Sequence, residues 1–200
     1  MKKMKKIVTI LLIVFVLTGC NSLFTYNNEK KEYLTGKYYT EMKIKNYGIM
    51  EMELDADVAP ITVTNFMNLV RNKAYDGNKF HRIFKDFVIQ CGALEDEYES
   101  IKGEFDANGV NNTLSHVRGT LSMARMGDAT TGYNTASTQF FIVLEDSPSL
   151  DHYYASFGKV IKGMEVADKI AKTITNVDSN GVVLNEYDRP IIEYIKEIEK

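Results

Sequence analysis

The sequence predicts a mainly β domain, folded as a barrel or a sandwich and accompanied by two helices. Short segments that alternate apolar and polar residues are bounded by glycine, asparagine or aspartate, which is typical of strands. Only two segments carry apolar residues at helical spacing. The chain has 200 residues, 44% of them hydrophobic and 26% charged, which suits one domain with a sizeable core.

The strands are expected in order along residues 38–45, 49–54, 80–91, 120–124, 139–144 and 157–161. The first two flank Asn46-Tyr47-Gly48, a short hairpin turn, and the second alternates methionine or leucine with glutamate as a half-buried strand does. Residues 80–91 are predicted to form two strands hinged at Lys85-Asp86. Residues 191–198 fit a strand or a helix equally well by pattern.

The two helices are expected from Pro60 onward and over residues 164–172. Proline is favoured at the first position of a helix, and Val63, Phe66, Met67 and Val70 follow at i, i+3, i+4 and i+7, a stripe typical of core packing. Two long segments rich in glycine and asparagine, 94–117 and 127–138, remain outside these elements. Loops of this length in a compact domain usually carry function.

The N-terminus has the form of an export signal. Four lysines among the first six residues precede an apolar run over 7–17, which is too short to span a bilayer. The run ends in LTGC at Cys20, which resembles the bacterial lipobox, whose cysteine is lipidated and becomes the mature N-terminus. An ordinary signal or an uncleaved anchor with a chance cysteine is the alternative. Residues 1–20 are therefore expected to be a lipoprotein signal peptide, 21–36 a flexible tether and 37–200 the folded domain.

Charge and cysteine content exclude several classes. Without the four lysines of the signal, 20 basic residues stand against 27 acidic ones, a net charge near −7, so no nucleic-acid partner is expected. With Cys20 lipidated, Cys91 has no partner for a disulfide and is expected to be an inert buried thiol. The three histidines lack metal-binding spacing, and Asp178 begins a turn rather than a calcium loop, so neither metal nor cofactor is expected.

Residues 80–92, FHRIFKDFVIQCG, raise a question about Arg82. Strand alternation places it on the side of Phe80 and Phe84, opposite His81, and a guanidinium is costly to bury unless it is paired. Read alone, Arg82 is either a structural ion pair at a sheet edge or a functional group. Read alone, Gln90 is more often a surface or capping amide.

Four ordered blocks resolve that question by resemblance. The blocks occur in the order FHRIFKDFVIQCG, GTLSMAR at 119–125, TQFFIVL at 138–144 and LDHYYASFGKV at 150–160. Through them the chain resembles the cyclophilin-type peptidyl-prolyl cis-trans isomerases over nearly all of residues 38–198. The resemblance implies an eight-stranded antiparallel closed barrel capped by two helices, with 191–198 as its closing strand. It also implies rotation about X-Pro bonds in proline-containing polypeptides, by a monomer.

The resemblance also implies roles for individual residues. Arg82 matches the catalytic arginine, and Gln90 the glutamine that holds it and the substrate carbonyl. The family positions that line the hydrophobic pocket for the proline ring are occupied here by Phe87, Val88, Phe141 and Leu150, all of which would be assigned to the core on pattern alone. The family positions along the groove are occupied by Ala124, Arg125, Gln139 and Tyr154. His81 follows the family pattern but is expected to be a satisfied core or supporting histidine.

Departures from the family pattern concern the groove rather than the arginine. Ser149 stands where many eukaryotic members carry a tryptophan that contributes to cyclosporin binding, so weak drug sensitivity is expected. Tyr154 replaces a histidine, Arg125 replaces the usual asparagine and adds a positive charge, and Val88 replaces a longer methionine. Activity is expected to survive with an altered sequence preference.

The sequence admits three functions. The leading one is a lipid-anchored isomerase that speeds folding of exported proteins, on the outer face of the membrane of a Gram-positive bacterium, as the lysine-, asparagine- and isoleucine-rich composition suggests. The alternative is a non-catalytic module or holdase that binds proline-containing segments. Retention of both Arg82 and Gln90 favours the enzyme. Nothing specific supports a surface adhesin.

Overall fold

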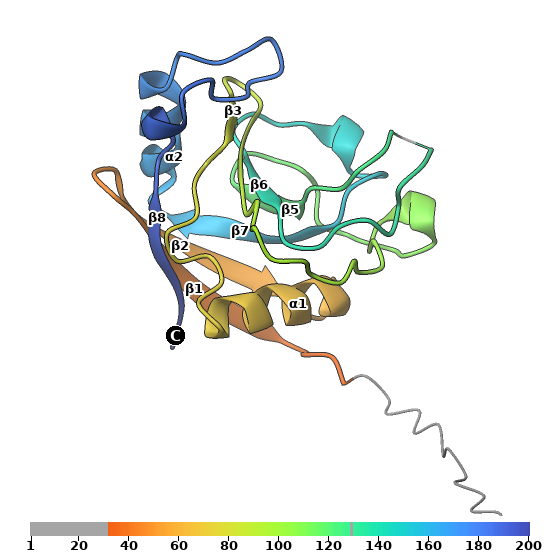
Figure 1. Ribbon diagram of the computed structural model, residues 1–200. Helices are drawn as coiled ribbons and strands as arrows, with labels where there is room; N and C mark the ends of the chain where they lie inside the picture. The colour runs from red at the N-terminus through yellow and green to blue at the C-terminus, as the bar shows by residue number, and fades with distance from the viewer. Residues whose placement is uncertain (1–31, 129) are drawn as a thin grey trace, which may run out of the picture. The chain divides into compact units, whose positions relative to one another are not determined.

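The computed structural model describes residues 32–128 and 130–200. Its strands form one antiparallel sheet in the order β3-β4-β6-β5-β7-β2-β1-β8 (Figure 1). The elements are β1 (Lys37–Ile44), β2 (Gly48–Asp55), α1 (Pro60–Arg71), β3 (Arg82–Phe84), β4 (Val88–Cys91), β5 (Thr120–Met123), β6 (Phe140–Val143), β7 (Ser156–Lys162), α2 (Met164–Thr173) and β8 (Ile192–Ile198). The predicted signal peptide, Cys20 and most of the predicted tether lie outside the described residues.

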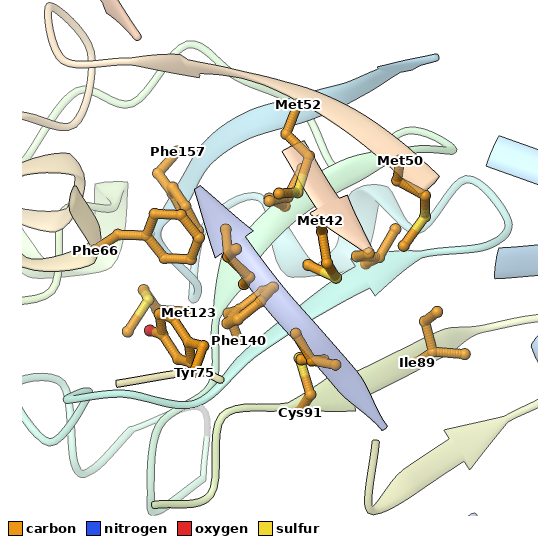
Figure 2. Close-up of a cluster of buried hydrophobic side chains, with 14 of the residues drawn as sticks. Met42, Met50, Met52, Phe66, Tyr75, Ile89, Cys91, Met123, Phe140 and Phe157 are labelled. Carbon is orange, nitrogen blue, oxygen red and sulfur yellow. The ribbon is translucent and has the colours of Figure 1, made fainter. Parts of the chain in front are cut away.

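The first hairpin supplies much of the core. Met42 of β1 and Met50, Met52 and Leu54 of β2 are fully buried, while the residues between them face outward, as period-two alternation requires. The turn residue Asn46 has φ of 66°, a left-handed conformation that asparagine tolerates well. Figure 2 shows these methionines among the buried side chains of the core, together with Phe66, Tyr75, Phe140 and Phe157.

The two helices cover the sheet. α1 begins at Pro60 as predicted and packs on β2 and β8, whereas α2 contacts β2 and β3 (Figure 1). Within the described ranges, no helix is both long and apolar enough to cross a bilayer. Ahead of β1, the Leu34 N–H donates to Thr64 Oγ1 at 2.8 Å and the Gly36 N–H to Asp57 Oδ1 at 2.7 Å, so these two residues lie against the domain.

The sheet is a curled half-barrel. The closed barrel expected from the resemblance is not observed, because the strand pairing leaves two edges. β3 and β8 are the two edges and do not pair with each other. The residues just before β3 reach the start of β8 through a single bridge, Lys79 to Ile191, and through hydrogen bonds such as that from the Phe80 N–H to the Pro190 carbonyl at 2.9 Å. Residues 192–198 are a strand, which settles the ambiguity of their pattern.

The neighbouring strands β4 and β6 carry apolar side chains on both of their faces. In β4, Ile89 and Cys91 belong to the main core, whereas Val88 points to the other side; in β6, Ile142 belongs to the core and Phe141 points away. Val88, Phe141 and Val143 thereby form a second apolar cluster outside the main core. This second cluster is where the candidate site lies.

Candidate active site

A pocket of about 280 Å³ opens over the second cluster. Its lining residues come from β3, β4, β6 and the segments that follow β5 and precede β7. All of them were predicted as site residues from the sequence: Arg82, Phe87, Val88, Gln90, Ala124, Arg125, Phe141, Leu150 and Tyr154. Residues of four sequence blocks, from Arg82 to Tyr154, are thus brought around one cavity.

Arg82 lies at the polar edge of the pocket. Its Nε donates to the Asn180 carbonyl at 2.8 Å and its Nη1 to Gln90 Oε1 at 3.2 Å. The guanidinium carbon lies 5.7 Å from the ring centre of Phe84 and 6.0 Å from that of Phe87, within the range of cation–π attraction. Burial, the largest cause, lowers the pKa of Arg82 from its ordinary value, against smaller opposing contributions from Tyr154 and Asp178. A guanidinium keeps its charge in proteins all the same.

A chain of amides continues from Arg82. Gln90 is its register partner across β3 and β4, and Gln90 Nε2 donates to Gln139 Oε1 at 3.0 Å. The backbone N–H of Ala124 donates to the Gln139 carbonyl at 2.9 Å, which fixes the edge that follows β5. Gln139, the one predicted groove residue outside the first pocket, therefore orders the wall beside it.

Aromatic and aliphatic side chains make the rest of the pocket. Phe141 is 5% exposed and meets the ring of Tyr154 edge to face, with centroids 5.8 Å apart. Phe87, Leu150 and Tyr154 are half-buried and pack on the second cluster. An apolar floor with a charged donor and an amide at one edge suits a small ring joined to a polar amide.

Arg125 is held differently from Arg82. Its Nε donates to the Tyr153 carbonyl at 2.8 Å and its Nη1 to the Thr131 carbonyl at 2.7 Å. Its guanidinium lies 4.8 Å from the ring centre of Tyr154 and 5.3 Å from that of Tyr133. The added charge is therefore built into the wall of the groove.

Sequence reasoning missed several neighbours of the site. A second hollow of about 180 Å³ shares Gln90, Ala124 and Arg125 with the first and contains the predicted Gln139. It adds three residues that were not predicted, Met126, Thr135 and Ser137. The carbonyl of Asn180, 98 residues from its partner Arg82, comes from the turn closed by Asp178, whose Oδ1 accepts from the Asn180 N–H at 2.8 Å. Strand alternation predicts Phe84 on the side of Arg82, where it lies, but no local signal points to Asn180.

His81, Phe80 and Cys91 lie outside the lining of this pocket. His81 is half-buried, but it is not the satisfied histidine that was expected, because its Nδ1 is buried without a hydrogen-bond partner. Burial, followed by the charge of Arg189, lowers its pKa. Phe80 belongs to the main core rather than to the face of Arg82, because β3 begins only at Arg82. Cys91 is fully buried, which raises the pKa of its thiol well above the ordinary value. Across the two described ranges, no three histidine, cysteine or acidic side chains gather as a metal site would require.

Known proteins share this architecture and sequence. The family model for cyclophilin-type peptidyl-prolyl cis-trans isomerases matches residues 39–193, and that for the prokaryotic membrane lipoprotein lipid attachment site matches residues 4–21. The chain is 35% identical to peptidyl-prolyl cis-trans isomerase A of Dickeya dadantii over 94% of each chain, and 43% identical to an Acinetobacter baylyi peptidyl-prolyl cis-trans isomerase over 68% of this chain and 73% of that protein.

A solved structure agrees with these matches. The crystal structure of a Cryptosporidium parvum cyclophilin-type peptidyl-prolyl cis-trans isomerase superposes with a TM-score of 0.69 at 27% identity, and covers 82% of this chain and 99% of that one. The same protein was also solved in the presence of the dipeptide Ala-Pro. Fold, sequence and the family model agree, and the chain belongs to the cyclophilin-type peptidyl-prolyl cis-trans isomerases.

Proposed function

We propose that this isomerase rotates X-Pro bonds by seating the proline ring on Phe141 and holding the twisted amide with Arg82. The observation that carries the proposal is the position of a fixed guanidinium at the edge of an apolar pocket of about 280 Å³. The Cryptosporidium protein solved with Ala-Pro belongs to the same family, and the same dipeptide unit fits the chemistry of this pocket.

The reaction explains why an arginine suits the task. An X-Pro amide has partial double-bond character, with a rotation barrier of roughly 18–20 kcal/mol, and no bond needs to be broken. Catalysis therefore requires only that the twisted amide binds better than either planar form. In the twisted state the prolyl nitrogen becomes pyramidal and accepts a hydrogen bond, which a guanidinium can donate without losing its charge.

Gln90 has two roles in this proposal. Its Oε1 accepts from Arg82 Nη1, which restricts the guanidinium to one orientation, and its Nε2 donates toward Gln139. In a bound complex Gln90 also helps hold the substrate carbonyl. The walls supplied by Phe87, Leu150 and Tyr154 exclude water from the ring, which strengthens the polar contacts at the edge.

The test is a refolding reaction limited by proline isomerisation. Arg82→Ala should lose most of the rate, and Arg82→Lys should recover little because an ammonium lacks the planar fork of donors. Lys85→Ala, at an exposed position directly after β3, controls for a general disturbance of this strand. A wild-type rate in Arg82→Ala would remove Arg82 from the mechanism.

We further infer that the enzyme works outside the cytoplasm, tethered through Cys20. The attachment-site match over residues 4–21 supports export and anchoring. Residues 1–20 would be the signal, 21–36 the tether and 37–200 the isomerase domain, on the outer face of a Gram-positive membrane. The last residues of the proposed tether, Leu34 and Gly36, already bond to the domain. Metabolic labelling with a fatty acid should mark the wild type and spare Cys20→Ala; a labelled variant would contradict the anchor.

A holdase function is the second candidate, and exposed apolar groups beside the groove favour it. Met126 is 71% and Phe84 38% exposed, and both flank the lining residues. Such groups can retain unfolded chains without turnover. Suppression of aggregation that persists in Arg82→Ala, together with negligible isomerase activity in the wild type, would favour holding over catalysis.

A further inference from the structure

His116 lies directly behind the pocket and has no solvent exposure. Its ring stacks on Phe141, with centroids 6.1 Å apart and planes at 25°. Its Nδ1 lies 2.8 Å from Asp151 Oδ1, and its Nε2 lies 2.8 Å from Ser122 Oγ. Both ring nitrogens are thus engaged inside the protein.

The partners decide how the ring is protonated. An ionised carboxylate only accepts, so Nδ1 carries the hydrogen and donates to Asp151, and Nε2 accepts from the Ser122 hydroxyl. The backbone is used as well: the His116 N–H donates to Asp151 Oδ1 at 2.6 Å, and the Ser147 N–H donates to the His116 carbonyl at 2.7 Å. Burial lowers the pKa of His116 while Asp151 raises it, and the net lowering keeps the ring neutral at neutral pH.

Each partner is attached to a different wall of the pocket. Asp151 follows Leu150 directly, at the end of the short 3-10 turn Pro148–Leu150. Ser122 is the register partner of Phe141 across β5 and β6. One imidazole therefore links the turn that carries Leu150 to the strand pair that carries Phe141, and it also supports the Phe141 ring from behind.

We propose that His116 is a positioning residue for the isomerase, which fixes the distance between the Leu150 wall and the Phe141 floor. The inference rests on this pocket being the proline site. His116 touches neither substrate nor Arg82 and acts only through Phe141 and Leu150. It sets the shape of the pocket before the substrate arrives.

The expected effect of losing His116 falls on binding. Without its two hydrogen bonds the 148–151 turn and the Phe141 ring gain freedom, and this freedom must be given up when the proline ring enters. KM should therefore rise, whereas kcat, which depends on Arg82, should change little. A merely structural role would instead lower the concentration of folded enzyme and leave KM as it was.

Two substitutions separate the two links. The amide of Asn lies near the position of Nδ1, so His116→Asn keeps the link to Asp151; the longer Gln in His116→Gln reaches toward Ser122. His152→Gln is the matched control, because His152 Nδ1 lies 2.9 Å from Asp106 Oδ2 in a similar pair whose side chains are 66% and 67% exposed.

The experiment measures kcat and KM on an X-Pro peptide, together with the affinity for the Ala-Pro dipeptide by NMR titration. In both His116 variants KM should rise about fivefold and dipeptide affinity should fall in step, with kcat within about twofold of wild type, as expected for loss of one buried hydrogen bond. His152→Gln should match wild type.

Several results would overturn the proposal. These are unchanged KM and dipeptide affinity in folded His116 variants, a loss confined to kcat, or an equal loss in His152→Gln. If neither His116 variant folds, Asp151→Asn is the alternative, because it keeps the shape of the side chain. This variant should raise KM, and an unchanged KM would contradict the positioning role of His116. Wild-type enzyme that binds no Ala-Pro would refute the proline site itself rather than the role of His116.

Discussion

Two arginines in one groove illustrate how residue environment decides role. Arg125 donates to three backbone carbonyls and lies against aromatic rings, and its remaining Nη2 is buried, so its guanidinium is part of the wall. Arg82 donates to Asn180 and Gln90 through two of its five N–H groups and retains others for a substrate. The same residue type is thus a structural support in one place and the candidate catalyst in the other.

At the same scale, Gln90→Leu should lower kcat/KM about tenfold, because Arg82 loses the acceptor that orients it and a half-buried amide link to Gln139 is broken. Gln139→Leu removes only the outer link of the chain and should cost less. Isomerisation of an X-Pro peptide followed by NMR exchange measures both. A wild-type kcat/KM in Gln90→Leu would show that Arg82 is held well enough without it.

Ser149 is the basis of a prediction about the binding of cyclosporin A. It lies in the turn Pro148–Leu150 beside a pocket wall, and it offers none of the aromatic area that a tryptophan would. Cyclosporin A should therefore inhibit weakly, and Ser149→Trp should tighten inhibition about tenfold through the added aromatic contact. Inhibition of the wild type at low nanomolar concentration would contradict this reading.

Among the elements, those with regular alternation were the predictable ones. β1, β2 and α1 fall within a residue or two of their expected bounds, because period-two and 3.6-residue patterns are local properties of the chain. β4 and β6 are apolar on both faces, so their pattern could not tell core from pocket; the resemblance assigned Phe87, Val88, Phe141 and Leu150 to the pocket. Contacts across long separations, such as Asn180 with Arg82, have no local signature at all.

The cap at the N-terminus of α1 is a second contact between residues that are far apart in the sequence. Ala59 at its N-terminus provides no side-chain cap, and Glu104, which is 2% exposed, replaces it. Its carboxylate accepts from the Ile61 N–H at 3.0 Å, the Thr62 N–H at 2.8 Å and Thr62 Oγ1 at 2.7 Å. A negative charge here also complements the helix dipole.

Glu104→Gln should therefore destabilise the domain by about 2 kcal/mol, because one oxygen becomes an amide that cannot accept and the charge is lost. Urea unfolding measures the change, with Glu97→Gln, an exposed position on the same long loop, as the control. Equal stability of the two variants would mean that α1 does not depend on this cap.

At the scale of the whole molecule, the curled sheet separates stability from function. One face buries the main core under α1, and the other face carries the second cluster and the pocket. A closed barrel was expected from the resemblance, but the edges β3 and β8 do not pair with each other. The residues before β3 reach the start of β8 through the bridge between Lys79 and Ile191 and through a few hydrogen bonds. Closure depends on how far a sheet curls, and no residue pattern reports it.

The stability of the whole domain should fall in mild acid. Burial, as the larger cause in each, lowers the folded-state pKa of both His81 and His116, whereas an unfolded histidine titrates near about 6.5. Below that pH the unfolded chain binds more protons than the folded one, so stability is complete above about 6.5 and is lost as pH falls through the folded values. Carboxylates such as Asp151 contribute with the same sign only at lower pH, because their ordinary pKa is 3.8 and is lowered further.

Urea unfolding between pH about 7.5 and about 5 tests this, since the range covers histidine titration and excludes most carboxylate titration. The free energy of unfolding should decrease steadily toward pH 5, and His116→Gln should show a shallower decrease because one of the two buried imidazoles is gone. A free energy that is constant or rises toward acid would mean that neither histidine must be neutral in the folded state. An unchanged slope in His116→Gln would leave His81 as the sole origin and would show that Asp151 accommodates a charged His116.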